Sequence, residues 1–261
     1  MADGINLKKP VPSPDEIAHK AVALIKSKAN PERAVGAQRY FKDQISSYGL
    51  TSDEVRDIAK NLYADVRGVW SVRDAIDFCE ILLPNKYLDV KGTATLIFLR
   101  YADDFEPAVF SLVKKWLSRD YLDNWASVDV LCPDALGGLL EKHPSLVQKI
   151  KDWTASPNRW VKRASAVSFI KLARRGKFLD PAYAVAKRLL SVEDDLIEKA
   201  NGWLLREAGK TDMPRLEKFL LVHGAKIPRT TLRYAIERFP EPKRRNILER
   251  TKPSTSWPSR P

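Results

Sequence analysis

Apolar and polar residues follow one another along this chain with the period of an α-helix. Many segments place apolar residues at positions i, i+3, i+4 and i+7, the spacing of one helical face. No run of alternating Val, Ile and Thr is bounded by Asn-Gly or Asp-Gly, as a β-hairpin would be. The pattern predicts an all-α protein of about a dozen or more short helices. The predicted helical segments are residues 18–29, 33–45, 52–66, 72–83, 91–105, 106–118, 124–143, 144–155, 158–175, 181–191, 193–209, 213–224, 228–239 and 241–251.

Capping residues mark two of the predicted helix starts. Ser13 precedes a proline and two acids, and Ser52 precedes Asp53. A serine side chain can accept a hydrogen bond from a free N–H group of the first turn, and acids in that turn are favoured there. We therefore expect Ser13 and Ser52 to be N-caps.

The helical segments repeat along the chain. When residues 161–175 are moved forward by 36 positions, they lie on residues 197–211, and a step of 34 back from Arg163 reaches Asp129. A period of 34–36 residues with two helices per unit predicts an α-solenoid of HEAT-like helical hairpins, curved around a concave basic groove. We expect one such domain over residues 31–250, an N-terminal extension or first helix over 1–30, and a disordered tail over 251–261. The matched positions are Val161 on Ile197, Arg163 on Lys199, Ala164 on Ala200 and Val167 on Trp203.

The charge of the chain favours a polyanionic partner. The net charge is +12, and residues 157–179 carry seven Lys and Arg without any Asp or Glu. A further ten basic and three acidic residues lie in 226–261. A positive excess of this kind is typical of nucleic-acid binding. Solubility alone would explain a positive sum, but it explains a 23-residue stretch free of acids less well.

Several classes of protein are disfavoured by what the sequence lacks. The first residues have no apolar core, and no stretch approaches the roughly 20 apolar residues of a membrane span. Cys79 and Cys132 lie in apolar runs without metal-ligand spacing, and the three histidines are scattered. No phosphate-binding glycine loop or Ser-His-Asp pattern occurs. We expect a cytoplasmic, nucleoid-associated protein with buried free thiols.

One carboxylate stands out in this pattern. Trp125 and Asp129 are four residues apart in a segment that otherwise indicates a buried helix, so they share a face. A buried carboxylate without a partner is costly. The repeat places Asp129 at the level of Arg163 and Lys199 on successive helices, and Trp203 lies one turn after Lys199. The partner of Asp129 is either Arg163, in a structural pair, or a positive charge that develops on a substrate.

Four short blocks carry a resemblance to a known family. They are QRYFKDQ with YGL within residues 38–50, WASVDVL (125–131), NRWVKRA (158–164) and KANGWLLREAGK (199–210). In this order they resemble the bacterial DNA alkylation repair proteins of the AlkD type, which are DNA glycosylases built from HEAT-like repeats. The second block is similar to the one that carries the catalytic Asp of that family and a flanking Trp.

The resemblance implies a DNA-alkylpurine glycosylase that hydrolyses the N-glycosidic bond of 3-methyladenine and 7-methylguanine. The implied catalytic residues are Asp129, Trp125 and Trp203, with neither metal nor cofactor. The implied partner is double-stranded DNA with alkylated bases, bound by a monomer. The implied DNA contacts are Arg163, Tyr40, Lys199, Arg206 and Lys162.

Other interpretations of the same residues stay open. A tryptophan at helical spacing is often part of a core, and Asp129 could form a buried pair with Arg163. The chain could then be a non-catalytic DNA- or RNA-binding repeat protein that uses the same basic groove. A protein-binding scaffold is a third alternative, although its groove would more often be acidic or apolar.

Overall fold

The computed structural model describes residues 11–252, and these are helical with one isolated bridge between Ser46 and Tyr87. The predicted all-α fold is confirmed. The predicted disordered tail lies largely in residues 253–261, outside the described residues. The helices are α1 (Pro14–Ser27), α2 (Pro31–Ala37), η1 (Gln38–Tyr40), α3 (Ser52–Val66), α4 (Val72–Leu82), α5 (Leu88–Phe98), η2 (Leu99–Asp104), α6 (Ala108–Ser118), α7 (Trp125–Lys142), α8 (Leu146–Asp152), η3 (Trp153–Ala155), α9 (Arg159–Val167), α10 (Ile170–Arg174), α11 (Leu179–Arg188), η4 (Leu189–Ser191), α12 (Asp195–Gly209), α13 (Met213–His223), η5 (Gly224–Lys226), α14 (Arg229–Ala235) and α15 (Glu241–Arg250).

The chain divides into two compact units, Met1–Phe105 and Glu106–Pro261. The division falls inside the range 31–250 that the sequence treats as one domain. Helix α1 lies in residues 1–30, where the sequence predicts an N-terminal extension or first helix, and it packs on α3, α4 and α5 within the first unit. Whether residues 31–250 fold as one domain stays a prediction.

Caps and one buried carboxylate organise the first unit. Ser13 caps α1 as predicted, but α3 is capped by Thr51, one residue before the predicted Ser52. Thr51 is the cap because it forms a complete capping box with Glu54. Its side chain accepts a hydrogen bond from the Glu54 N–H, and the Glu54 side chain accepts one from the Thr51 N–H. Asp89, at the start of α5, is buried and accepts hydrogen bonds from the N–H groups of Tyr48 and Leu50. That carboxylate fixes the loop before α3.

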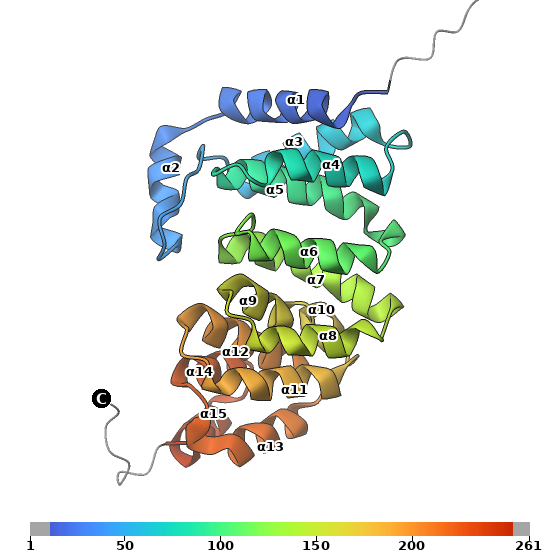
Figure 1. The fold of residues 1–261 in the computed structure, drawn as a ribbon. Helices are drawn as coiled ribbons and strands as arrows, with labels where there is room; N and C mark the ends of the chain where they lie inside the picture. Colours follow the sequence, from blue (N-terminus) through green and yellow to red (C-terminus); the bar gives the residue numbers. More distant parts are fainter. Residues whose placement is uncertain (1–10, 253–261) are drawn as a thin grey trace, which may run out of the picture. The chain divides into compact units, whose positions relative to one another are not determined.

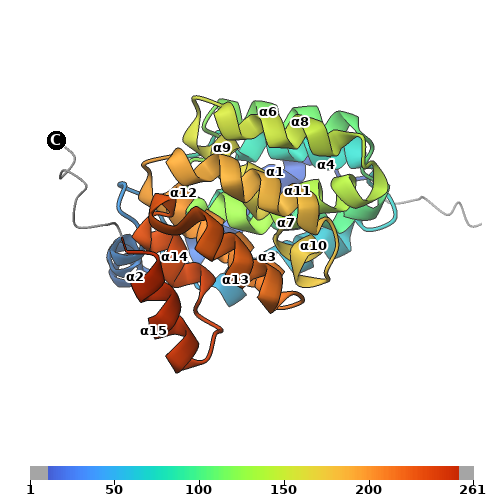
Figure 2. The same ribbon diagram turned by 90° about the horizontal axis from the view of Figure 1, so that it is seen from below.

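The second unit is built of two helical layers. Figure 1 shows α6, α8, α11 and α13 stacked one after another. Helix α7 contacts α9, α9 contacts α12, and α12 contacts α14, which makes a second row beside the first. Figure 2 shows α15 projecting at the end of this unit, where it packs on α13. This is the packing of stacked helical hairpins.

Polar contacts between neighbouring repeats reveal the period directly. Arg159 pairs with Asp194, Arg174 with Glu207 and Arg175 with Glu141, at separations of 35, 33 and 34 residues. The predicted spacing of 34–36 residues therefore corresponds to one step from a hairpin to the next.

The predicted helix over residues 158–175 is interrupted. It ends at Val167 and resumes at Ile170, because the N–H of Phe169 bonds to Ala166 in a tighter turn. The carbonyl of Ser168 lies close to Gly137 on α7, where a Cβ atom would come within 2.8 Å of it. The glycine allows the two helices to approach at the interruption.

The core contains most of the large aromatic residues. The four tryptophans that the sequence leaves as core or partly exposed are all buried, at 0–7% exposure: Trp70, Trp116, Trp153 and Trp160. Cys79 and Cys132 are buried free thiols, as predicted. No helix in the described part of the chain has the length and apolar character needed to cross a bilayer.

Two glycine substitutions should change stability in opposite directions. In Gly202→Ala the new Cβ would lie 2.5 Å from Tyr234 Cβ and 2.7 Å from the Thr231 carbonyl oxygen. We expect this overpacking to lower the free energy of unfolding by about 1–3 kcal/mol. At Gly138, inside α7, a Cβ atom would meet no other atom within 4 Å. Gly138→Ala should therefore raise the free energy of unfolding by about 0.5–1 kcal/mol. Urea unfolding measures both, and shifts of the same sign would contradict the packing.

Candidate functional site

Asp129 is held by a bidentate ion pair across one repeat step. It lies in the second turn of α7, a helix whose first turn is capped by Asn124. Arg163 on α9 donates from Nε to Asp129 Oδ1 at 2.8 Å and from Nη2 to Oδ2 at 2.7 Å. The side chain of Asp129 is 15% exposed, whereas that of Arg163 is 6% exposed. The carboxylate thus lies nearer to solvent than the cation that holds it.

Arg163 is also fixed from the other side. Its Nη1 donates to the carbonyl oxygen of Leu196 in the first turn of α12. One guanidinium therefore links three consecutive helices of the same row. The sequence expects Arg163 to hold a phosphate. Such a contact stays a prediction, which this buried geometry does not favour.

The environment of Asp129 differs from that of other buried carboxylates in the unit. Burial raises the pKa of Asp129 above its ordinary value, and the hydrogen bonds and charge of Arg163 oppose that rise. Burial also tends to raise the pKa of Glu207, but Lys210 and Arg174 outweigh it and the pKa is lowered. Among the described residues, Arg163 alone opposes the effect of burial on Asp129, and the pKa of Asp129 therefore stays raised.

The two candidate tryptophans are half-buried. Trp125 is the first residue of α7, one turn before Asp129 and on the same face. Trp203 lies on α12 between Gly202 and Leu204, both of which are buried. Neither tryptophan is a fully buried core residue.

The candidate cations differ in how they are engaged. Lys199 pairs with Asp195 on its own helix at 2.9 Å, and Arg206 pairs with Glu237. Lys162 is half-buried, and no side-chain partner is described for it within residues 11–252. Most of the predicted positive charge on this row is thus already compensated. Exposed ion pairs contribute only about 0–1 kcal/mol, so a phosphate could replace their carboxylates.

These side chains define one surface, which we call the candidate face. The helices α7, α9 and α12 pack side by side, and the Asp129–Arg163 and Arg159–Asp194 pairs join them. On α12 the half-buried residues Lys199, Trp203 and Arg206 follow one helical face, at i, i+4 and i+7. The candidate face consists of Trp125, Asp129, Lys162, Lys199, Trp203 and Arg206.

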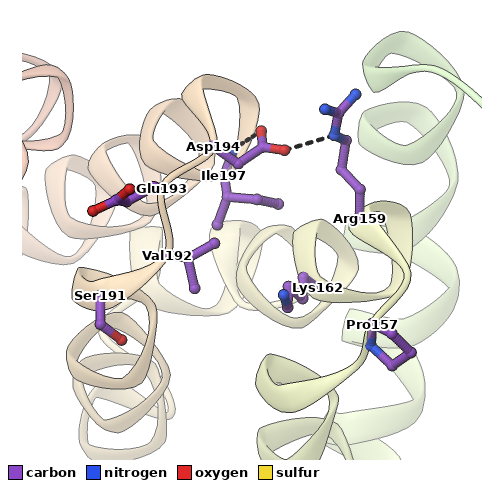
Figure 3. Close-up of a pocket in the computed structure, with 8 residues that line it drawn as sticks. All are labelled: Pro157, Arg159, Lys162, Ser191, Val192, Glu193, Asp194 and Ile197. Atoms are coloured by element: carbon purple, nitrogen blue, oxygen red, sulfur yellow. Dashed lines mark hydrogen bonds and ion pairs between the residues drawn. The ribbon is translucent and has the colours of Figure 1, made fainter. Parts of the chain in front are cut away.

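A pocket that the sequence did not predict lies at the start of α9 and α12. Its volume is about 570 Å³. Figure 3 shows Lys162 among the residues that line it, together with the Arg159–Asp194 ion pair. Only Lys162 belongs to the predicted site residues, although Arg159 lies in the block NRWVKRA and Ile197 is one of the matched repeat positions. The lining residues are Pro157, Arg159, Lys162, Ser191, Val192, Glu193, Asp194 and Ile197.

Tyr40 belongs to the first unit. It ends η1 and is 63% exposed. Arg39 donates a hydrogen bond to its hydroxyl at 2.7 Å and covers its ring, with the guanidinium carbon 4.8 Å from the ring centroid. An exposed tyrosine held by an arginine is compatible with the predicted DNA contact, which stays a prediction.

The positive excess of the chain belongs to the unit that carries the candidate face. Residues 106–261 contain 30 Lys and Arg against 18 Asp and Glu, whereas residues 1–105 contain 15 of each. The net charge of +12 therefore lies in the second unit. A polyanion would be attracted to that unit first. Within the described residues, no group of three or more His, Cys, Asp and Glu side chains is placed to hold a metal ion.

Comparison with known proteins gives one family. The family model described as DNA alkylation repair enzyme matches residues 21–239. A solved structure titled as a predicted DNA alkylation repair enzyme from Enterococcus faecalis superposes with a TM-score of 0.72. It covers 82% of this chain and 97% of its own, at 19% sequence identity, and so supports the fold. No curated protein matches.

Removing the cation beside Asp129 should make stability depend on pH. In Arg163→Ala, burial alone acts on Asp129, so its folded-state pKa rises further above the unfolded value of about 3.9. The folded state then binds the proton more tightly than the unfolded state. Stability relative to wild type should be retained near pH 4 and lost as the pH rises, by about 3–5 kcal/mol at neutral pH.

Urea midpoints of wild type and variant at both pH values measure this loss. In the double variant Asp129→Asn/Arg163→Ala the carboxylate is gone, so most of the pH dependence should disappear. An equal loss in Arg163→Ala at pH 4 and pH 7 would show that packing, and not charge, explains the effect.

Proposed function

The chain belongs to the DNA alkylation repair enzyme family, and we propose that it is a DNA glycosylase that releases cationic alkylated purines. The observation that carries the proposal is the position of Asp129 in a strongly basic unit. Its carboxylate is partly exposed and is held by Arg163, whose side chain is more deeply buried. The proposed substrates are 3-methyladenine and 7-methylguanine in double-stranded DNA.

The chemistry of such bases suits a single fixed carboxylate. Alkylation at a ring nitrogen makes the purine a cation, so it leaves without a general acid. The bond between C1′ and the base nitrogen breaks, its electron pair leaves with the neutral base, and the sugar becomes oxocarbenium-like. A carboxylate can stabilise that cation and orient the water that adds to C1′, as in glycoside hydrolysis. The water loses its proton to solvent, which leaves an abasic site.

Arg163 has the role of a positioning residue in this proposal. Two of its hydrogen bonds go to the two carboxylate oxygens of Asp129, and the third goes to the Leu196 carbonyl, so the carboxylate is fixed before substrate binds. A carboxylate has about four acceptor positions, so two bonds from Arg163 leave room for water or a substrate group. An anion fixed in advance needs no reorganisation during the reaction, which is where electrostatic catalysis gains most.

The remaining residues of the candidate face would hold the DNA. Trp125 and Trp203 would pack against the sugar and backbone of the damaged nucleotide, since indole faces suit such groups. Lys162, Lys199 and Arg206 would contact phosphates, the last two after exchange of their carboxylate partners. Tyr40 is a further proposed contact from the first unit.

The bidentate pair itself favours one alternative. Asp129 and Arg163 could serve only to join α7 to α9, and the chain would then bind nucleic acid without catalysis. In that case removal of the negative charge should tighten DNA binding and change nothing else. The two functions therefore differ in base release.

Asp129→Asn should abolish most of the base release. We expect the single-turnover rate on a duplex with 7-methylguanine to fall by about 10²–10³-fold, while DNA binding is kept or tightened. Free base is measured with excess enzyme, and the spontaneous rate is subtracted. Asp134→Asn is the matched control, because Asp134 lies on the same helix in an exposed pair with Lys171. Wild-type rates in Asp129→Asn would remove Asp129 from the mechanism, and no release by wild type would favour the non-catalytic alternative.

Lys162→Ala should weaken DNA binding in a salt-dependent way. Loss of one phosphate contact should make the slope of log K against log salt shallower by about 0.9. Fluorescence anisotropy over a salt series measures the slope. Lys149→Ala, an exposed lysine on α8 in the other helical row, is the control and should keep the wild-type slope. Equal slopes in all three proteins would place the bound phosphates away from Lys162.

A further inference from the structure

The candidate face continues beyond α12 onto α14. On α14 and the turn after it, Arg233, Tyr234 and Glu237 are exposed and Thr230 is half-buried, and these four residues follow one helical face. The half-buried face of α12 ends with Arg206, and Arg206 pairs with Glu237. Because this pair joins the two faces, the surface of α14 that meets solvent is continuous with the one that carries Trp203.

Contacts between α12 and α14 place a tyrosine next to the Gly202–Trp203 step. The Arg206–Glu237 pair spans 31 residues and holds the end of α14 to α12. The hydroxyl of Thr231 donates to the Glu198 carbonyl oxygen at 3.0 Å and fixes α14 against α12 one turn earlier. Between these two contacts, Tyr234 lies against Gly202, the residue before Trp203.

Gly202 is what allows Tyr234 to lie so close. A Cβ atom at Gly202 would come within 2.5 Å of Tyr234 Cβ, a distance that real side chains do not tolerate. Gly202 is fully buried under α14, and the next residue is Trp203. Gly202 thus allows α14 to pack closely on α12 next to Trp203.

Part of the aromatic ring of Tyr234 is exposed to solvent. It is 37% exposed, and no hydrogen bond of its hydroxyl is described within residues 11–252. Arg233 beside it is exposed, and no ion pair is described for it in the same part of the chain. A flat ring with a polar tip next to a cation is suited to a sugar-phosphate backbone, because the ring packs on the sugar and the tip and cation face phosphate.

We propose that Tyr234 is a third aromatic DNA contact, which extends the row formed by Trp125 and Trp203 to the nucleotide backbone next to the lesion. The inference rests on the proposed function in one respect, since it assumes that DNA lies along the candidate face. Tyr234 would act in binding and not in chemistry. Its loss should raise the dissociation constant for any duplex and leave the rate of base release at saturating enzyme unchanged.

The decisive variant is Tyr234→Leu, because leucine keeps apolar cover over Gly202 and removes the ring. Affinity for a labelled duplex, with and without one 7-methylguanine, should fall by about fivefold or more. Tyr234→Phe keeps the ring and should retain most of the affinity. Val222→Ala removes another exposed apolar side chain, on α13, and should bind as wild type. Thermal midpoints of all variants check that the fold is intact.

Unchanged affinity in Tyr234→Leu would overturn the inference, as would an equal loss in Val222→Ala. Failure of the proposed function gives a different result. If wild type binds duplex but releases no base, while Tyr234→Leu still binds more weakly, then the contact stands and the glycosylase assignment falls. If base release depends on Asp129 but Tyr234→Leu binds duplex as wild type does, then the glycosylase assignment stands and the contact falls.

Discussion

The guanidinium of Arg163 joins three helices of the second unit, α7, α9 and α12, through its hydrogen bonds. Moving a carboxylate and a guanidinium out of water costs several kcal/mol for each ion, and a good mutual geometry returns much of that cost. Here the geometry is bidentate, and the backbone carbonyl of Leu196 takes a third N–H. Apolar residues of similar size could join these helices equally well. Stability alone therefore does not explain why these helices are joined by an ion pair. The need to fix a carboxylate near the surface would explain it.

The distribution of charge gives this local arrangement its context. All of the net positive charge lies in the unit that contains Asp129, yet most cations near it are paired with acids. The unit as a whole can thus attract a polyanion at long range while its face carries little unpaired charge. Binding would then proceed by exchange, in which phosphates replace carboxylates that contribute little.

The sequence predicted the parts of this structure that a period can determine. Equivalent positions one repeat apart meet, so a shift of 34 residues was enough to bring Asp129 to Arg163. A period does not determine rotamers or local competition. Lys199 turned to Asp195 on its own helix, and Thr51 displaced Ser52 as a cap because only Thr51 has a glutamate at the third helical position. The Leu196 carbonyl is a backbone group that no side-chain pattern marks, and the pocket at α9 is completed by residues 191–194, which lie outside the blocks.

The pairs on the candidate face differ in burial, and this difference bears on how a basic surface could keep the anion proposed for catalysis. The partners of Asp195 and Glu237 are partly exposed cations, which an approaching phosphate can draw away. The partner of Asp129 is buried and has a second anchor on α12, so a phosphate cannot reach it without unpacking the helices. DNA would therefore leave the Asp129 pair intact while it rearranges the others. Asp129 would then still have its hydrogen bonds from Arg163 when a positive charge develops on the sugar.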